Sequence, residues 1–301
     1  MTIGLRSAID NNDLLPLALL LTQIDVDAPS SELEGMTPIM YAIHYSMIES
    51  LETIINAGAS IEETDEAGYS PLAYAVHRHM EKCVKVLLDA GAKPDVVAGE
   101  NHIPLHIAVS RGNSGILKLF LTQKINLDVH DADGHTAITL AASRGYPSLL
   151  HVLINAGAEI NTKRNLTALD CAIAHTNWGC AKLLLRAGAK PTSSQNLLSL
   201  LRTCIEMEQI GLTKMLFAHG AHPNQVDQKT GISLMEVVVA RGNIEMLEMV
   251  MKQGARLDMD DQNSRLTRRM IRENKQLYEE FVFRFPNALP PEDMNPKGEV
   301  L

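Results

Sequence analysis

Arginine side chains that could contact a binding partner recur along this sequence at a fixed spacing. Arg78, Arg111 and Arg144 follow one another at intervals of 33 residues, and Tyr45 stands 33 residues before Arg78. Arg241, much later in the chain, occupies the same position of the pattern. Arginine and tyrosine are enriched among the residues that contribute most to protein–protein binding. If the spacing reflects a repeated structure, these side chains form a ladder on one surface.

Histidine side chains recur at the same spacing, which suggests metal binding or pH sensing. The pairs are His44 with His77, and His102 with His135. Corresponding positions of stacked helical units lie on the order of 10 Å apart, which is wide for the ligands of one metal ion. We therefore expect neither a metal ion nor another cofactor.

The sequence contains none of the local motifs that usually mark an enzyme. It has no glycine-rich phosphate loop, no nucleophile elbow and no His-Glu-x-x-His segment. We therefore expect a noncatalytic protein without catalytic residues. An enzyme whose site is built from scattered repeat residues is the alternative, and a deep pocket with perturbed carboxylates would support it.

The elements that would position these side chains are helices that begin at the same spacing. Thr and Ser cap helix N-termini, and Pro favours the first helical turn. In the first unit, an apolar run at Leu51, Ile54 and Ile55 has helical spacing, and Gly58 supplies the positive φ that ends the helix. A fixed period of this length indicates a stacked-repeat protein. The segments that begin the units, each 33 residues after the last, are Thr37-Pro38-Ile39, Ser70-Pro71-Leu72, Ile103-Pro104-Leu105 and Thr136-Ala137-Ile138.

This pattern resembles the ankyrin repeat family. The third unit contains Pro104-Leu105-His106, the closest match to the family's Thr-Pro-Leu-His, and later units begin near Thr167 and Ser233. The resemblance implies an all-α fold, an ankyrin-repeat solenoid of stacked helix-turn-helix units with short hairpin loops. We expect about seven repeats plus terminal caps. The resemblance also implies that His106 holds neighbouring loops by hydrogen bonds.

Two units depart from the pattern in ways that affect their structure. In the third unit Ile103 replaces the capping residue, and Lys124 stands where the other units have glycine. That helix must end differently or place a non-glycine residue at positive φ. The sixth unit is the weakest match, and we expect it to open early over residues 192 to 212.

The chain is expected to contain three regions. Residues 1–262 form the ankyrin repeat domain, with an N-terminal cap over residues 2–30 and repeats from about residue 35 to residue 262. Residues 263–285 form a C-terminal capping helix. Residues 286–301 form a mobile tail, because they have little apolar surface to bury.

The family generally binds other proteins through a concave face made of hairpin tips and first helices, so the resemblance implies a protein partner. Two interpretations of the arginine ladder stay open. The arginines contact the partner, or they pair with neighbouring hairpin carboxylates as ordinary exposed ion pairs. An adaptor that recruits a second protein through its C-terminal segment is a further alternative. The candidate partner-binding residues are Tyr45, Glu66, Tyr69, His77, Arg78, His102, Arg111, Asp133, His135 and Arg144.

Composition narrows the class of partner and the compartment. The 301 residues carry a formal net charge of −9, which argues against general nucleic-acid binding. The four cysteines form no close Cys-x-x-Cys pair, which favours a reducing compartment. No segment is recognisable as a signal peptide or is long enough to span a membrane. We expect a cytoplasmic or nucleocytoplasmic monomer that binds a protein, without a nucleic-acid or membrane partner.

Overall fold

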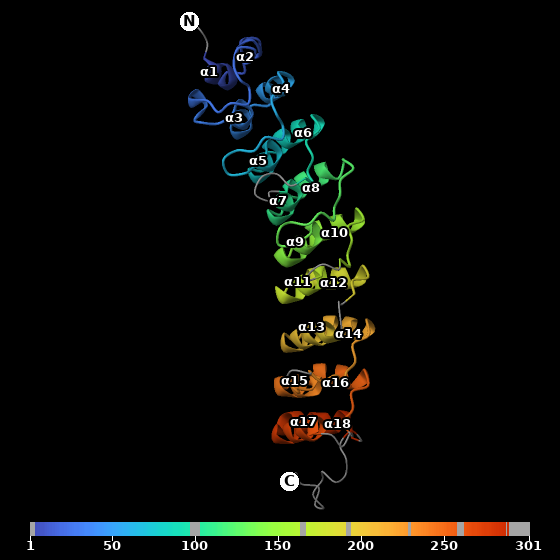
Figure 1. The fold of residues 1–301 in the computed structure, drawn as a ribbon. Helices are drawn as coiled ribbons and strands as arrows, with labels where there is room; N and C mark the ends of the chain where they lie inside the picture. Colours follow the sequence, from blue (N-terminus) through green and yellow to red (C-terminus); the bar gives the residue numbers. More distant parts are fainter. Residues whose placement is uncertain are drawn as a thin grey trace, which may run out of the picture. The chain divides into compact units, whose positions relative to one another are not determined.

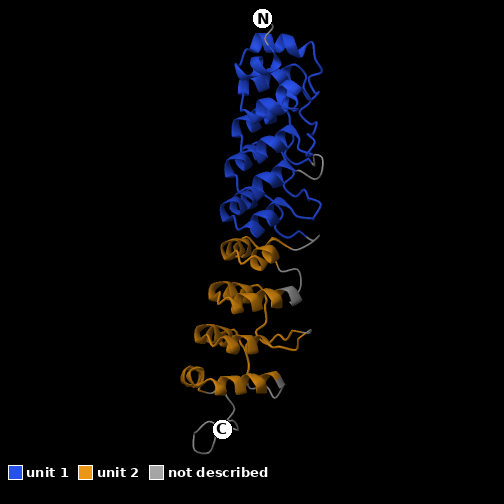
Figure 2. Cartoon of the chain, turned by 90° about the vertical axis from the view of Figure 1, so that its left-hand side faces the viewer, with its two compact units in different colours: residues 1–165 blue, residues 166–301 orange. Residues whose placement is uncertain are grey.

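The computed structural model describes residues 4–96, 103–162, 167–190, 194–227, 230–257, 262–286 and 288. Within these residues the chain forms helices, turns and isolated β-bridges but no strand, so the all-α expectation is confirmed. No helix of this part of the chain has both the length and the apolar composition needed to cross a membrane. The chain divides into two compact units, Met1–Asn165 and Leu166–Leu301, which we describe separately (Figure 2).

Unit 1 is a stack of helix pairs that follow one another along the chain (Figure 1). From α3 onward the odd-numbered helices contact one another in series, and the even-numbered helices do the same, so the unit has two helical layers. Its elements are α1 (Leu5–Asp10), α2 (Leu14–Leu21), the 3-10 helix η1 (Ser31–Leu33), α3 (Pro38–His44), α4 (Ile48–Asn56), α5 (Pro71–His77), α6 (Glu81–Asp89), α7 (Pro104–Ser110), α8 (Ser114–Phe120), α9 (Ala137–Arg144) and α10 (Pro147–Asn155).

Unit 2 repeats the same two-layer arrangement with longer helices at its end. Its odd-numbered helices form one series of contacts and its even-numbered helices the other. Its helices are α11 (Ala168–Ala174), α12 (Trp178–Arg186), α13 (Ser194–Glu206), α14 (Ile210–Ala218), α15 (Leu234–Arg241), α16 (Ile244–Lys252), α17 (Gln262–Glu273) and α18 (Lys275–Arg284).

The first helices of the repeats begin where the sequence predicts. The Thr37 hydroxyl accepts a hydrogen bond from the Met40 N–H at 3.3 Å, and the Ser70 hydroxyl accepts one from the Ala73 N–H at 3.2 Å. Ile103 forms no such cap, and its side chain is instead only 1% exposed. The third repeat therefore has buried apolar surface at the position where the other two repeats have a capping hydrogen bond.

The second helices end in two ways. Gly58 and Gly91 follow α4 and α6 with φ of +98°, as predicted. Lys124 is not among the described residues with positive φ. α8 ends at Phe120 instead, two residues shorter than α6, and a turn follows in which the Thr122 N–H bonds to the Leu119 carbonyl at 3.1 Å. Of the two expected solutions, the different helix ending is therefore the correct one.

The C-terminal region differs from the single capping helix expected over residues 263–285. It contains two helices, α17 and α18, which pack against α15 and α16. Asn274 separates them because its side-chain oxygen accepts a hydrogen bond from the Leu277 N–H at 3.1 Å, which starts a new helix. The tail expected at residues 286–301 lies almost wholly outside the described residues.

Candidate protein-binding surface

The ladder residues of unit 1 stand at the C-terminal ends of successive odd-numbered helices. Tyr45, Arg78 and Arg111 directly follow α3, α5 and α7, and Arg144 is the last residue of α9. All four side chains are exposed. Since α3, α5, α7 and α9 contact one another in series, the repeat places these side chains along one edge of the odd-numbered layer.

Three of the predicted residues form a connected group in the second and third repeats. The rings of Tyr69 and His77 lie 5.2 Å apart between centroids. The Arg111 guanidinium donates a hydrogen bond to the His77 Nε2. These contacts join Tyr69, before the cap of α5, to His77 at the end of α5 and to Arg111 after α7. They hold the Arg111 side chain in a defined position.

The arginines of the ladder are not neutralised by hairpin carboxylates in the described part of the chain. Arg78, Arg111 and Arg144 form no ion pair there, whereas Arg6 pairs with Asp10 and Glu34 in the same unit. The interpretation that the ladder serves structural ion pairing therefore has no support from the described contacts. The three guanidinium groups remain able to receive an acidic or carbonyl group.

Tyr45 belongs to an aromatic group at the first repeat. Its ring lies 4.6 Å from that of Tyr41 and 4.8 Å from that of His44, and its hydroxyl donates to a Glu34 carboxylate oxygen at 3.2 Å. Partial desolvation of the exposed ring, with a smaller effect of the Glu34 carboxylate, raises the pKa of Tyr45. The buried Tyr41 beneath it donates to Asp10 at 2.9 Å, and its pKa rises to about 12, mainly through burial.

The hairpin that precedes α9 is organised by Asp131. One Asp131 carboxylate oxygen accepts the His135 N–H at 2.7 Å, and the His135 Nδ1 lies 3.6 Å from the other oxygen. Asp131, Asp133 and His135 offer ligand atoms within 4.8 Å of one another. Hairpin acids gather in this way as turn residues, so we assign no metal ion to them.

His106 has the loop-holding contact that the resemblance implies. Its Nε2 donates to the His135 carbonyl at 3.0 Å, which links the helix of one repeat to the hairpin of the next. Burial lowers the pKa of His106, so the neutral ring is favoured. The contact therefore links two neighbouring repeats, and His106 is not among the candidate partner-binding residues.

The remaining predicted residues are Glu66, which is exposed in the hairpin before α5, and His102. His102 lies outside the described residues. The structure therefore joins Tyr69, His77 and Arg111 by direct contacts and places Tyr45 and Arg78 along the same edge.

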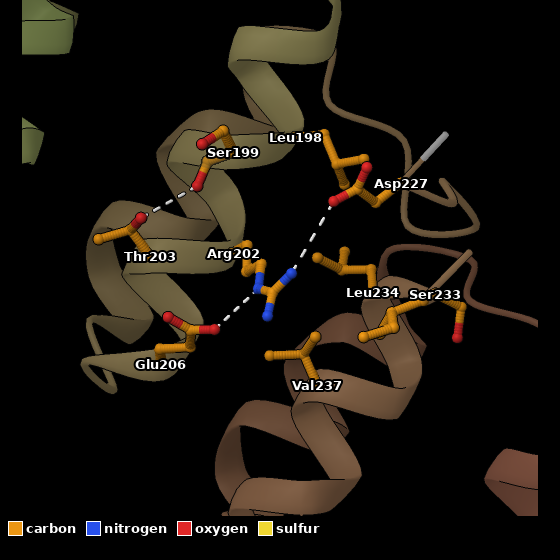
Figure 3. Close-up of a pocket in the computed structure, with 10 residues that line it drawn as sticks. Leu198, Ser199, Arg202, Thr203, Glu206, Asp227, Ser233, Leu234 and Val237 are labelled. Atoms are coloured by element: carbon orange, nitrogen blue, oxygen red, sulfur yellow. Dashed lines mark hydrogen bonds and ion pairs between the residues drawn. The ribbon is translucent and has the colours of Figure 1, made fainter. Parts of the chain in front are cut away.

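A cavity of about 480 Å³ in unit 2 was missed by the sequence analysis. It lies between α13, α15 and the hairpin before α15, and Arg202 projects into its centre (Figure 3). The Arg202 Nε donates to a Glu206 oxygen at 2.8 Å, and its Nη1 lies 3.9 Å from an Asp227 oxygen. The signal in the sequence that could have indicated this pair is the spacing of four residues between Arg202 and Glu206 on one helix. Both carboxylates at the cavity therefore face the guanidinium group of Arg202.

Comparison with known proteins places the chain in a family. A family model described as ankyrin repeats (3 copies) matches residues 5–98 and 105–195. These two segments span more than half of the chain, and the chain belongs to the ankyrin repeat family. Members of this family are generally noncatalytic modules for protein–protein interaction.

Among solved structures, the chain is similar to the ankyrin repeat domain of Bcl-3, described as a unique member of the IkappaB protein family. The two are 21% identical with a TM-score of 0.61, and the similarity covers 71% of this chain and 99% of that chain. At this identity the similarity establishes the fold alone. A comparison with curated proteins finds no match.

Proposed function

We propose that this chain is a noncatalytic scaffold that binds a protein partner on the concave face of unit 1. The observation that supports the proposal is the arginine ladder, since Arg78, Arg111 and Arg144 are exposed and form no ion pair with a described carboxylate. Arginine forms bidentate hydrogen bonds with carboxylates and is enriched at the centres of protein interfaces. We accordingly propose a partner segment with acidic groups opposite the ladder.

The direct test is reversal of charge in the ladder. The triple variant Arg78→Glu, Arg111→Glu, Arg144→Glu should lose at least about a hundredfold in affinity for a partner isolated with the full chain. The matched control changes three exposed lysines on the even-numbered helices, Lys82, Lys85 and Lys118, to glutamate. Both variants change the net charge equally. Equal affinity of the two folded variants would remove the ladder from the binding site.

A second candidate, an adaptor that recruits another protein through its C-terminal segment, is favoured by one side chain. Phe283 on α18 is 88% exposed although it is a large aromatic residue. Exposed aromatic side chains are frequent anchors in protein interfaces. If a second partner binds through Phe283, its binding should leave the affinity of the first partner for the ladder unchanged.

We also propose a cytoplasmic or nucleocytoplasmic location for the chain as a monomer. Its four cysteines are free and buried, which suits a reducing compartment. Measurement of the molar mass in solution by light scattering tests the oligomeric state.

A further inference from the structure

Negative charge is concentrated in the first quarter of the chain. Residues 1–80 contain twelve Asp and Glu, two Arg and no Lys, a formal charge of −10, whereas the whole chain carries −9. One of the two arginines, Arg6, already pairs with Asp10 and Glu34. This part of unit 1 therefore attracts cationic groups.

A cavity of about 430 Å³ lies within this acidic part, between the hairpins of the first two repeats. We call it the acidic hairpin pocket. The side chains of Met36, Met40 and Tyr74 supply much of its apolar lining. Met40 is 5% exposed, so the wall that it forms is part of the packed core. The rim contains four carboxylates, those of Asp27, Glu63, Asp65 and Glu66.

Two of these carboxylates are fixed in place by backbone groups. An Asp27 oxygen accepts the Ser60 N–H at 2.8 Å, and an Asp65 oxygen accepts the N–H groups of Ala67 and Tyr69 at 3.0 and 2.8 Å. These bonds hold the hairpins and orient both acids without neutralising their charge.

The other two carboxylates are available to a ligand. Glu63 and Glu66 are exposed, and among the described residues their carboxylates accept no hydrogen bond and form no ion pair. The pocket thus combines an apolar wall with two fixed and two adaptable acids. A long aliphatic side chain with a cationic end matches both features, because its stem can lie on the apolar wall while its head reaches the carboxylates.

We propose that the acidic hairpin pocket receives an arginine or lysine side chain of a basic segment in the protein partner. The inference rests on the proposed function, since Glu66 belongs both to the pocket and to the predicted partner surface. It adds the chemistry of recognition, namely that unit 1 binds a cationic side chain in this pocket while the ladder binds acidic groups. A partner segment of mixed charge satisfies both sites.

The test uses the full chain and a small probe, Nα-acetyl-L-arginine amide, with the neutral isostere Nα-acetyl-L-citrulline amide as the control probe. Methionine methyl groups labelled with ¹³C report binding, because Met36 and Met40 line the pocket. A ligand of about 15 non-hydrogen atoms at ordinary ligand efficiency binds with a Kd on the order of 1 mM. The Met36 and Met40 signals should shift saturably with the arginine probe and not with the citrulline probe.

A double variant, Glu63→Gln with Glu66→Gln, should weaken binding of the arginine probe at least about tenfold. The control variant, Glu52→Gln with Glu62→Gln, removes the same charge outside the pocket and should bind as the natural chain does. Absence of a saturable shift, equal shifts with both probes, or unchanged binding by the double variant would overturn the proposal. The measurement needs no partner, so its failure is distinct from a failure of the ladder variants to lose a partner.

Discussion

Short polar side chains at the first position of a repeat decide where its first helix begins. Ser70 lies before α5, and its hydroxyl accepts the Ala73 N–H, which would otherwise have no partner within the helix. Ser110 lies at the end of α7, and its hydroxyl donates to the Ile107 carbonyl. The same residue type thus acts as a cap at one end of a helix and not at the other.

Ser70→Ala should therefore cost about 1 kcal/mol of unfolding free energy, the usual loss for an N-cap. Ser110→Ala should change the free energy by less than about half as much, because alanine suits a helical position better than serine. Urea unfolding followed by circular dichroism measures both. Equal losses in the two variants would show that the cap of α5 contributes nothing specific.

The cysteine thiols should be unreactive in the folded chain. All four are buried, and burial raises the pKa to about 11 for Cys83 and about 12 for Cys204. The thiolate is the reactive form. Ellman's reagent at pH 8 should label the native chain slowly and all four thiols quickly in denaturant. Rapid labelling of the native chain would contradict the burial.

The same shifts give the sign of a pH effect on stability. The folded thiols have raised pKa values relative to the ordinary 9.0, so the unfolded chain loses its thiol protons first. Their contribution is fully present below about pH 9 and is lost progressively as the pH rises from about 9 through the folded pKa values of about 11 and about 12. A loss of stability in that window is the expected result of a denaturation series.

Helix boundaries were predictable where a local signal fixes them. Thr37, Ser70 and Gly58 were assigned from the sequence because capping and positive φ each require few residue types. The division at Asn274 was missed, since the apolar spacing on either side continues with a helical period. The early end of α8 was one of two solutions, and packing of Phe120, which is fully buried, accompanies that choice.

The positions of the ladder residues were predictable from the sequence, but their contacts were not. The repeat places Arg78 and Arg111 at equivalent helix ends, so one period sufficed to align them. The contact of Arg111 with His77 joins residues from two repeats, and no sequence period states which side-chain rotamers meet. The cavity around Arg202 was missed for a related reason, because it depends on how α13 faces α15.

The sixth repeat remains the predicted weak element of the stack. Its first helix, α13, has 13 residues where α11 has seven, so it departs from the family pattern in length as well as in sequence. Hydrogen exchange should show earlier opening over residues 192 to 212 than over α5 and α6. Thiol labelling provides a second measure of local opening, because Cys204 in α13 is fully buried and Cys83 in α6 is 1% exposed. Cys204 should therefore react faster than Cys83 in the folded chain. Protection and labelling rates equal to those of α6 would contradict a local weak point.

For the chain as a whole, stability is approximately a sum over neighbouring repeats, and each end of a stack needs a cap. We propose α17 and α18 as the cap of unit 2, because Ile271 and Phe281 are fully buried and the two helices contact α15 and α16. The exposed side of α17 contains charged residues such as Arg265 and Arg269. A capping role and an adaptor role for this segment thus predict different effects on stability and binding when Phe281 or Phe283 is truncated to alanine.

Phe281→Ala should destabilise the chain by about 3 to 5 kcal/mol, as truncation of a fully buried phenylalanine does. Phe283→Ala removes an equal side chain that is 88% exposed and should stay within about 0.5 kcal/mol of the natural chain. Thermal and urea unfolding measure both, and binding of each isolated partner is measured in parallel. A large loss for Phe281 with full binding by the Phe283 variant establishes α18 as a cap. Loss of one partner in the stable Phe283 variant would instead make this helix a docking site, because the removed ring supports no part of the core.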